Sequence, residues 1–296
     1  MTAPLQGIAP LTHLGVIRAH GADAASFLHG QLTQDFALLD SQHARLAAYC
    51  SAKGRMLASF IGFKTGPEEI LLLCSKDLLP AMLKRLSMFV LRAKCKLTDA
   101  TAEFALCGIA GDAAGNDAPW TLRNVDGAHL VQLYPAAGTP RALWIASVGT
   151  ALPAGAVLSK ADWLWSEVAS GIATLSLSVQ EQFVPQMLNY ESVGGVNFKK
   201  GCYPGQEVVA RSQFRGTLKR RAYIAHADQP LAVGAEVFAA SDTEQPVGMV
   251  VQCAAAPAGG FDAIVSLQVA STDEALTVAG TALALQPLPY ELLADI

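Results

Sequence analysis

From about position 217 to its end the chain carries only short strand-like runs, and this limits its fold more than any other feature. Runs of apolar and β-branched residues are separated by turn residues, and none shows the three- and four-residue spacing of a helix. The expected strands cover 221–225, 236–240, 246–253, 263–269 and 281–285. Many short strands at close spacing are typical of a small β-barrel or sandwich, which we predict for residues 217–296.

Residues 1–216 carry both strand and helix patterns, so we predict an α+β body there. A chain of 296 residues exceeds the usual size of one domain, and two or three compact units are expected. Residues 111–119 are rich in glycine, alanine and aspartate, which predicts a linker or long loop. The expected strands of the body cover 14–20, 46–49, 56–63, 69–74, 94–98, 129–134 and 142–148.

Two helices are expected in the first hundred residues, each opened by a capping side chain. Asp23 is expected to cap a short helix over 24–29, because its carboxylate can accept a hydrogen bond from a free N–H of the first turn. Ser75 is expected to cap a second helix, whose apolar face runs from Leu78 to Phe89.

A third helix is expected after Ser159. Asp162 follows this serine by three residues, a spacing that resembles a capping box. We expect the helix to end near Gly171, where glycine favours termination. Its predicted buried side chains are Leu164, Val168 and Ile172.

Composition and charge narrow the class of protein. Charged residues make up 16% of the chain, against roughly 25% in an average globular domain, so core-forming residues are plentiful. No apolar run approaches the ~18 residues of a membrane-spanning helix, and the first residues do not resemble a signal peptide. The six cysteines include no Cys-x-x-Cys pair, which indicates reduced thiols. We therefore expect a cytoplasmic protein with no membrane partner, and the net charge of −4 disfavours general nucleic-acid binding.

The segment 196–207 holds the densest group of chemically able side chains. A Pro-Gly pair at 204–205 is typical of a type II turn, so Cys202 is expected on an accessible bend. Lys199 and Lys200 stabilise a thiolate by their charge, which favours a reactive thiol, whereas the other five cysteines are expected to be buried hydrophobic residues. No cysteine or histidine stands at ligand spacing and no protease signature occurs, so neither a metal site nor a Cys-His protease is predicted.

Basic residues concentrate in and after this segment. Seven of the 21 lysines and arginines fall within residues 199–221, where Glu207 is the one acid. Two interpretations stay open: a solvated strand edge protected by charge, or an anion site for a carboxylate tail, a phosphate or an RNA backbone. Few aromatic residues accompany them, so a small anion is favoured over single-stranded nucleic acid. The seven are Lys199, Lys200, Arg211, Arg215, Lys219, Arg220 and Arg221.

A third polar cluster covers residues 185–191. Gln186 and Asn189 can each donate and accept hydrogen bonds, which suits the edge of a heterocycle, although such residues are also common in ordinary loops. The chain has neither G-x-x-x-x-G-K-[ST] nor G-x-G-x-x-G, which disfavours nucleotide hydrolysis and Rossmann-type dehydrogenation.

Residues 200–207 read K-G-C-Y-P-G-Q-E, which resembles the K-G-C-Y-x-G-Q-E signature of the YgfZ family. These are folate-binding proteins linked to the assembly and repair of iron–sulfur clusters. The resemblance extends to Pro185-Gln186, Gly194-Gly195-Val196, Ala210-Arg211 and Phe214-Arg215-Gly216. Near the N-terminus, F-L-H-G-Q-L-T-Q-D at 27–35 and K-G-R at 53–55 resemble further segments of the family.

The YgfZ family is related to the T-protein of the glycine cleavage system, a tetrahydrofolate-dependent aminomethyltransferase. This relationship implies mixed α/β lobes, two of them within 1–216, around a central channel for folate, followed by a small C-terminal β-barrel. The T-protein has an aspartate pair after a glycine turn, but the corresponding stretch 54–60 has no carboxylate. In the T-protein a glutamate that binds the pterin lies two residues after a proline. Here Pro185 is followed by Gln186 and Met187, so this glutamate is absent, unless Gln186, Asn189 or Glu191 substitutes for it. Aminomethyl transfer is therefore disfavoured, whereas folate binding is retained.

The resemblance implies a role for each matching residue. Cys202 would be the redox-active or transfer thiol, and Lys200 would activate it. Arg211 or Arg215 is expected to pair with the glutamate tail of the folate, because its two carboxylates need cations and a bidentate guanidinium suits them. The other expected folate-binding residues are Gln186, Asn189, Tyr203, Gln206 and Glu207.

We therefore expect a protein that binds tetrahydrofolate or another folate and supports the assembly or repair of iron–sulfur enzymes, its client partners, with an indirect effect on tRNA modification. Two alternatives stay open. One is a tetrahydrofolate-dependent aminomethyltransferase, and the other is an accessory protein that binds tRNA through the basic segment.

Overall fold

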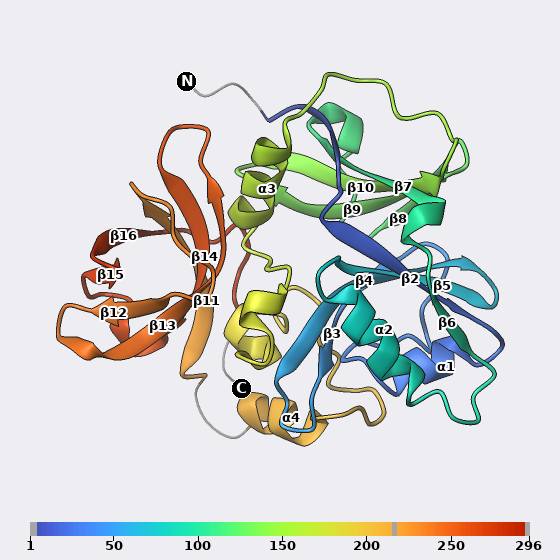
Figure 1. Ribbon diagram of the computed structural model, residues 1–296, viewed down its shortest axis with the longest axis horizontal. Helices are drawn as coiled ribbons and strands as arrows, with labels where there is room; N and C mark the ends of the chain where they lie inside the picture. The colour runs from blue at the N-terminus through green and yellow to red at the C-terminus, as the bar shows by residue number, and fades with distance from the viewer. Residues whose placement is uncertain (1–4, 215–217, 294–296) are drawn as a thin grey trace.

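The chain folds into two five-stranded sheets with their helices and a closed six-stranded barrel (Figure 1). The computed structural model describes residues 5–214 and 218–293. The barrel lies to one side of the two sheets, and a long segment with several helical turns lies between the barrel and the sheets. Among the residues described, no helix has the length and apolar character needed to cross a membrane.

The first sheet is buried on both faces. In β5 (Glu69–Ser75), alternate side chains enter different cores: Leu72 packs with the segments that lead to the barrel, and Leu71 and Leu73 pack against the second sheet. This explains the unbroken apolar run at its centre, since neither face meets water. The strands run in the order β3-β4-β5-β2-β6, namely Ala44–Cys50, Met56–Gly66, Glu69–Ser75, Leu14–His20 and Lys96–Asp99, and the helices are α1 (Ala24–His29) and α2 (Leu79–Ser87).

The second sheet continues the same layered packing. In β10, Leu143 and Ile145 point toward the first sheet, while Trp144 packs in a separate small core on the opposite face. Three of its strands, β1, β7 and β8, were not predicted. The strands run in the order β1-β7-β10-β9-β8, namely Gly7–Pro10, Phe104–Ala110, Thr139–Ser147, Ala128–Ala136 and Leu122–Val125, with short 3-10 turns at η1 (Thr101–Glu103) and η2 (Asp112–Ala114).

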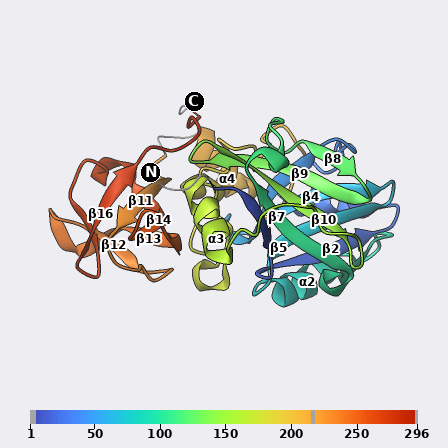
Figure 2. The same ribbon diagram turned by 90° about the horizontal axis from the view of Figure 1, so that it is seen from above.

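The segment between sheets and barrel contains α3 (Lys160–Ala169), η3 (Leu177–Val179), η4 (Pro185–Leu188) and α4 (Gln206–Phe214). Helix α3 lies between the second sheet and the barrel in both views, and it contacts strands β13 and β14 (Figures 1 and 2). Helix α4 was not predicted. Its valines and scattered polar side chains give only a weak apolar period, so the pattern gave no helix signal.

The C-terminal barrel confirms the prediction of a small barrel and decides against an open sandwich. Its core is aliphatic, and it closes on itself through pairing of β11 with both β14 and β16. Closure leaves no free sheet edge. The strands are β11 (Arg220–Ala227), β12 (Glu236–Ala239), β13 (Asp242–Ala255), β14 (Phe261–Gln268), β15 (Leu276–Val278) and β16 (Thr281–Gln286), with η5 (Val269–Ser271); β15 was not predicted.

Two of the three predicted helix caps are wrong. The carboxylate of Asp23 accepts a hydrogen bond from the backbone N–H of Lys94 at 2.7 Å and makes no capping bond to α1. Ser75 ends a strand, and α2 begins at Leu79, where a proline in the first turn replaces the missing cap. Ser159 is confirmed: its Oγ accepts from the N–H of Asp162 at 3.0 Å.

The predicted buried face of α3 is only partly right. Val168 is fully buried, whereas Leu164 and Ile172 are half-buried, and Trp163 occupies the central position between the sheets. Its ring packs directly on the backbone of β7, where a Cβ on Gly108 would lie 2.4 Å from two ring carbons. A glycine in a strand therefore makes room for the tryptophan of a helix.

We predict that Gly108→Ala lowers the free energy of unfolding by about 1–3 kcal/mol, because the added methyl group overlaps a ring that is buried on all sides. Urea unfolding measures the change. Gly66→Ala is the matched control, since the nearest atom to its added Cβ is 4.0 Å away. Equal stability of the two variants would contradict this packing.

Candidate functional site

The predicted thiol loop is fastened to the end of α1 by a buried lysine. Lys200 is only 8% exposed, and its Nζ donates hydrogen bonds to the backbone carbonyls of His29 and Leu32, the second at 2.9 Å. The ammonium also lies 4.6 Å from the ring centre of Tyr203, within range of a cation–π contact. Burial lowers the pKa of Lys200 to about 8, while the charges of Asp35 and Cys202 act in the opposite direction.

The Pro-Gly turn packs against the turn that joins β3 and β4. Gly205 has φ +81°, and a Cβ there would lie 2.4 Å from the carbonyl oxygen of Ser51 and 2.7 Å from the Cα of Gly54. Only glycine fits this conformation and this close approach. The structure thus brings together 53–55 and 200–207, two of the segments that resemble the YgfZ family.

Cys202 differs from the other cysteines in its surroundings. All six lie in the described residues; Cys202 is exposed, three are buried and two are half-buried. Burial raises the pKa of each of the other five thiols, to about 12 for Cys74 and about 11 for Cys95. A buried thiol of this kind is inert at neutral pH, so Cys202 is the best placed to react.

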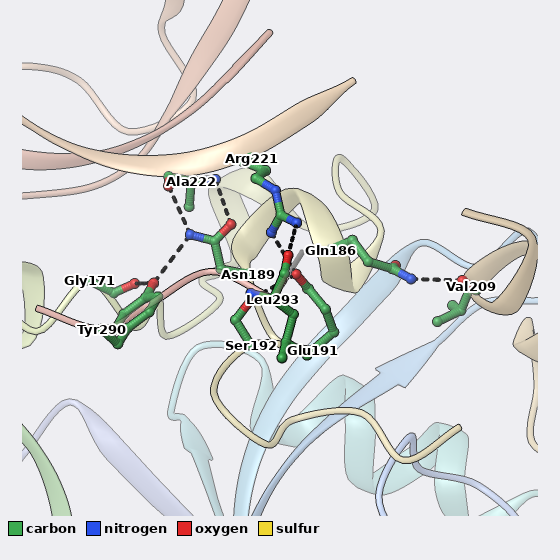
Figure 3. A network of polar contacts seen from close by, with 10 residues as sticks. All are labelled: Gly171, Gln186, Asn189, Glu191, Ser192, Val209, Arg221, Ala222, Tyr290 and Leu293. Atoms are coloured by element: carbon green, nitrogen blue, oxygen red, sulfur yellow. Dashed lines mark hydrogen bonds and ion pairs between the residues drawn. The ribbon is translucent and has the colours of Figure 1, made fainter. Parts of the chain in front are cut away.

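The polar cluster at 185–191 makes hydrogen bonds within the protein (Figure 3). Asn189 adopts a left-handed conformation with φ 58°, and its side chain exchanges hydrogen bonds with the backbone of Ala222 in β11, at 2.8 and 3.1 Å. Its amide also donates to the hydroxyl of Tyr290 at 3.2 Å. Gln186 donates to the carbonyl of Val209 in α4 at 2.7 Å, and its buried Oε1 has no protein partner.

Glu191 completes this junction through a buried ion pair with Arg221 at 2.7 Å. Arg221 also donates to the carbonyl of Leu293 at 2.8 Å, so the last described residues are attached to the first barrel strand. Burial raises the pKa of Glu191 although Arg221 opposes this effect. Removal of either partner would leave a buried charge.

The remaining predicted residues lie on α4 and its approach. Tyr203 is buried, which raises its pKa, and Gln206 donates to the carbonyl of Lys200 at 3.4 Å. Glu207 and Arg211 form an exposed ion pair one helical turn apart. Arg215 lies outside the described residues. Of the described basic residues of 199–221, Lys200 and Arg221 are buried, whereas Arg211 is exposed.

A cavity lies where the two sheets and α3 meet, with an empty volume of about 600 Å³ that includes its solvent-open part. None of the thiol-loop residues 196–207 lines it. Sequence reasoning missed it because its lining comes from elements far apart in the chain, with no local pattern. The lining includes Phe60, Leu73, Trp120, Tyr134, Arg141, Trp163, Glu167 and Tyr190.

Arg141 is a buried cation in the wall of this cavity. Its Nε donates to the carbonyl of Tyr134 at 3.2 Å and its Nη1 to the hydroxyl of Ser166 at 3.1 Å, while its Cζ lies 5.4 Å from the ring centre of Trp163. No carboxylate of the described residues forms an ion pair with it, and burial lowers its pKa to about 10 despite the charge of Glu167. A guanidinium in this position can bind an acceptor on a ligand.

Glu167 supplies the opposite charge on the same wall. Its carboxylate accepts from the indole N–H of Trp163 at 2.8 Å and from Gln252 at 3.2 Å, and His13 Nε2 lies 3.0 Å away. The cavity thus offers aromatic surfaces with a donor and an acceptor, which suits a flat heterocycle. In residues 5–214 and 218–293, no three His, Cys, Asp or Glu side chains gather as a metal site would require.

We predict that the free energy of unfolding of the wild type, relative to Lys200→Met, rises between about pH 8 and 10.5. In this window the unfolded chain keeps the lysine proton that the folded chain has released, because the folded pKa is lowered from 10.5 to about 8. Urea unfolding across this range measures the difference, and Lys199→Met is the exposed neighbour for comparison. A constant difference would contradict the burial of the charge.

Comparison with known proteins places the chain in a family. No family model matches it. An uncharacterized protein of Haemophilus influenzae is 31% identical over 230 residues, covering 77% of this chain and 76% of that protein. The tRNA-modifying protein YgfZ of Sodalis glossinidius is 30% identical over 300 residues, covering 94% of this chain and 90% of its own length.

The fold has a well-matched solved counterpart. The crystal structure of the glycine cleavage system aminomethyltransferase T from Bartonella henselae superposes with a TM-score of 0.69 and 17% identity, covering 97% of this chain and 87% of that one. This likeness confirms the expected T-protein-like fold. The 30% identity to the Sodalis protein extends over 94% of this chain, so the chain belongs to the YgfZ family.

Proposed function

We propose that this protein binds a reduced folate in the cavity and supports the assembly or repair of iron–sulfur enzymes through the thiol of Cys202. The observation that carries the first part is that two buried groups of opposite charge, Arg141 and Glu167, line one aromatic cavity without forming an ion pair with each other. Charged groups at this depth are unfavourable unless they are paired or bind something, so they are a marker of a ligand site.

The chemistry of the cavity suits a pterin ring. A pterin is flat, and its edge carries both hydrogen-bond donors and a carbonyl acceptor, which Glu167 and Arg141 complement. Trp163, Tyr134 and Phe60 offer aromatic surfaces against which such a ring packs.

The expected folate contacts of Gln186, Asn189, Tyr203, Gln206 and Glu207 stay predictions, as do those of Arg211 and Arg215 with the glutamate tail. The two amides Gln186 and Asn189 already bond to Val209 and Ala222. We assign the pterin to Arg141 and Glu167 because both line the cavity, which neither amide does. The carboxylate tail stays assigned to Arg211 or Arg215.

The aminomethyltransferase alternative is less well supported. Within 54–60, Ser59 is a polar side chain that lines the cavity, and no residue of this stretch carries a carboxylate. Its Oγ already accepts from the N–H of Leu175 at 2.9 Å. The carboxylate that serves the transfer chemistry of the T-protein is therefore missing from this stretch.

The name of the Sodalis relative favours a link to tRNA modification. We propose that this link is indirect, through an iron–sulfur enzyme that modifies tRNA. A direct tRNA contact through residues 199–221 is the weaker alternative, because Lys200, Arg211 and Arg221 are each engaged with groups of the protein itself.

Isothermal titration calorimetry with tetrahydrofolate tests the folate proposal. The wild type is expected to bind, and Arg141→Met to bind roughly 10–100-fold more weakly, because a hydrogen bond to a charged group contributes about 1.5–3 kcal/mol. Arg123→Met is the matched control, since Arg123 is a half-exposed partner of Asp117.

Circular dichroism of both variants separates lost binding from lost folding. Absence of binding by the wild type at high micromolar folate, or equal affinity of the two variants, would contradict the proposal.

A further inference from the structure

A histidine and an aspartate lie together at the end of α1 to which the thiol loop is fastened. His29 Nδ1 is 3.0 Å from Asp35 Oδ1, and the same carboxylate oxygen accepts from the backbone N–H of Leu38 at 2.9 Å. Burial acts to raise the pKa of Asp35, but the hydrogen bonds from Leu38 and His29 outweigh it and hold the pKa below its usual value. Asp35 is thus an ionised acceptor.

This pairing decides which ring nitrogen of His29 carries the hydrogen. An ionised carboxylate can only accept, so Nδ1 must donate to Asp35. Nε2 of the neutral ring is then left with a free lone pair. Within the described residues, no hydrogen-bond partner contacts Nε2.

The free nitrogen faces the backbone of the thiol loop. A Cβ placed on Gly201 would lie 3.4 Å from His29 Nε2 and touch nothing else within 4 Å. Gly201 has no side chain, so the imidazole lies directly beside the residue that precedes Cys202. Cys202 itself is exposed and is the next residue along the loop.

Lys200 holds the two parts in this arrangement. Its ammonium binds the backbone carbonyl of His29, so the loop and the histidine are fixed to one helix end. The titratable and charged groups of this region are Asp35, from the segment after α1, and Lys199, Lys200 and the thiol of Cys202, from the loop.

We propose that His29 is the general base of Cys202 and that Asp35 is the positioning residue that orients it. The S–H bond of Cys202 breaks, its proton forms an N–H bond at Nε2, and the electron pair stays on sulfur as a thiolate beside an imidazolium. The thiolate then attacks a soft electrophile, such as one sulfur of a disulfide, and the imidazolium protonates the thiolate that leaves. Carboxylate, imidazole and nucleophile have the same order of roles in other enzymes.

The inference rests on the proposed reactivity of Cys202 but needs neither folate nor a client enzyme for its test. The probe is iodoacetamide, and the readout is the alkylation rate of the peptide that contains Cys202, followed by mass spectrometry from about pH 6 to 10. Failure of folate binding or of iron–sulfur support would leave this profile unchanged, so the two proposals fail separately.

His29→Gln is expected to slow alkylation about fivefold at about pH 6.5 and not to slow it at about pH 9.5. A thiol without a base is only ~1% thiolate at pH 6.5, so a neighbouring histidine can raise the thiolate fraction considerably. A thiolate paired with histidine is also a weaker nucleophile, which offsets part of this increase and limits the expected change in rate. Asp35→Asn is expected to act in the same direction more weakly. A structural disturbance alone would not move the profile along the pH axis in this way.

His43→Gln is the matched control, because His43 forms a similar but exposed pair with Asp40 at 2.9 Å. Should His29→Gln fail to fold, the ring signals of His29 in the folded wild type and in Cys202→Ser give a second test. They should titrate at higher pH when the thiol is present. Identical alkylation profiles, or identical titrations with and without the thiol, would overturn the proposal.

Discussion

The hydrogen bonds made by residues 185–191 hold the molecule together at the place where its three parts meet. Asn189 joins this turn to the first strand of the barrel, and Glu191 forms a buried ion pair with Arg221 of the same strand. Gln186 joins it to α4, the helix that follows the thiol loop. A short 3-10 turn (Pro185–Leu188) and the residues after it therefore connect the barrel with the helix that follows the thiol loop.

Tyr190 shows how the same turn shapes the cavity. It lies between Asn189 and Glu191, its hydroxyl donates to the carbonyl of Ala173 at 2.6 Å, and it lines the cavity that we assign to folate. The thiol loop leaves from the other end of this segment and docks on α1 through Lys200. No residue of the thiol loop lines the cavity. Folate binding and thiol chemistry can therefore be separated by substitution.

The barrel and the reactive loop could be predicted from the sequence because both are local. Turn residues at close spacing mark the barrel strands, and K-G-C-Y-P-G-Q-E is a continuous run. Helix α4 was missed because its apolar period is weak. The hydrogen bonds of Asn189 with β11 were missed because an amide that joins a turn to a strand looks the same in sequence as one that binds a heterocycle. Arg141 and Glu167 stand on different elements, and His29 lies far from the thiol loop in the chain. Only the folded structure places the two charged groups in one cavity and the histidine beside Gly201.

Cys202→Ala tests the central claim most directly when folate affinity and iron–sulfur enzyme activity are measured on the same variant, the second in cells that lack the wild-type protein. The account predicts that support of the iron–sulfur enzyme is lost, while tetrahydrofolate affinity and stability stay close to the wild type, because the thiol is exposed and does not line the cavity. Cys107→Ala, which removes a buried thiol, should lower stability and retain activity. Retained iron–sulfur support by Cys202→Ala, or its unfolding, would contradict the account.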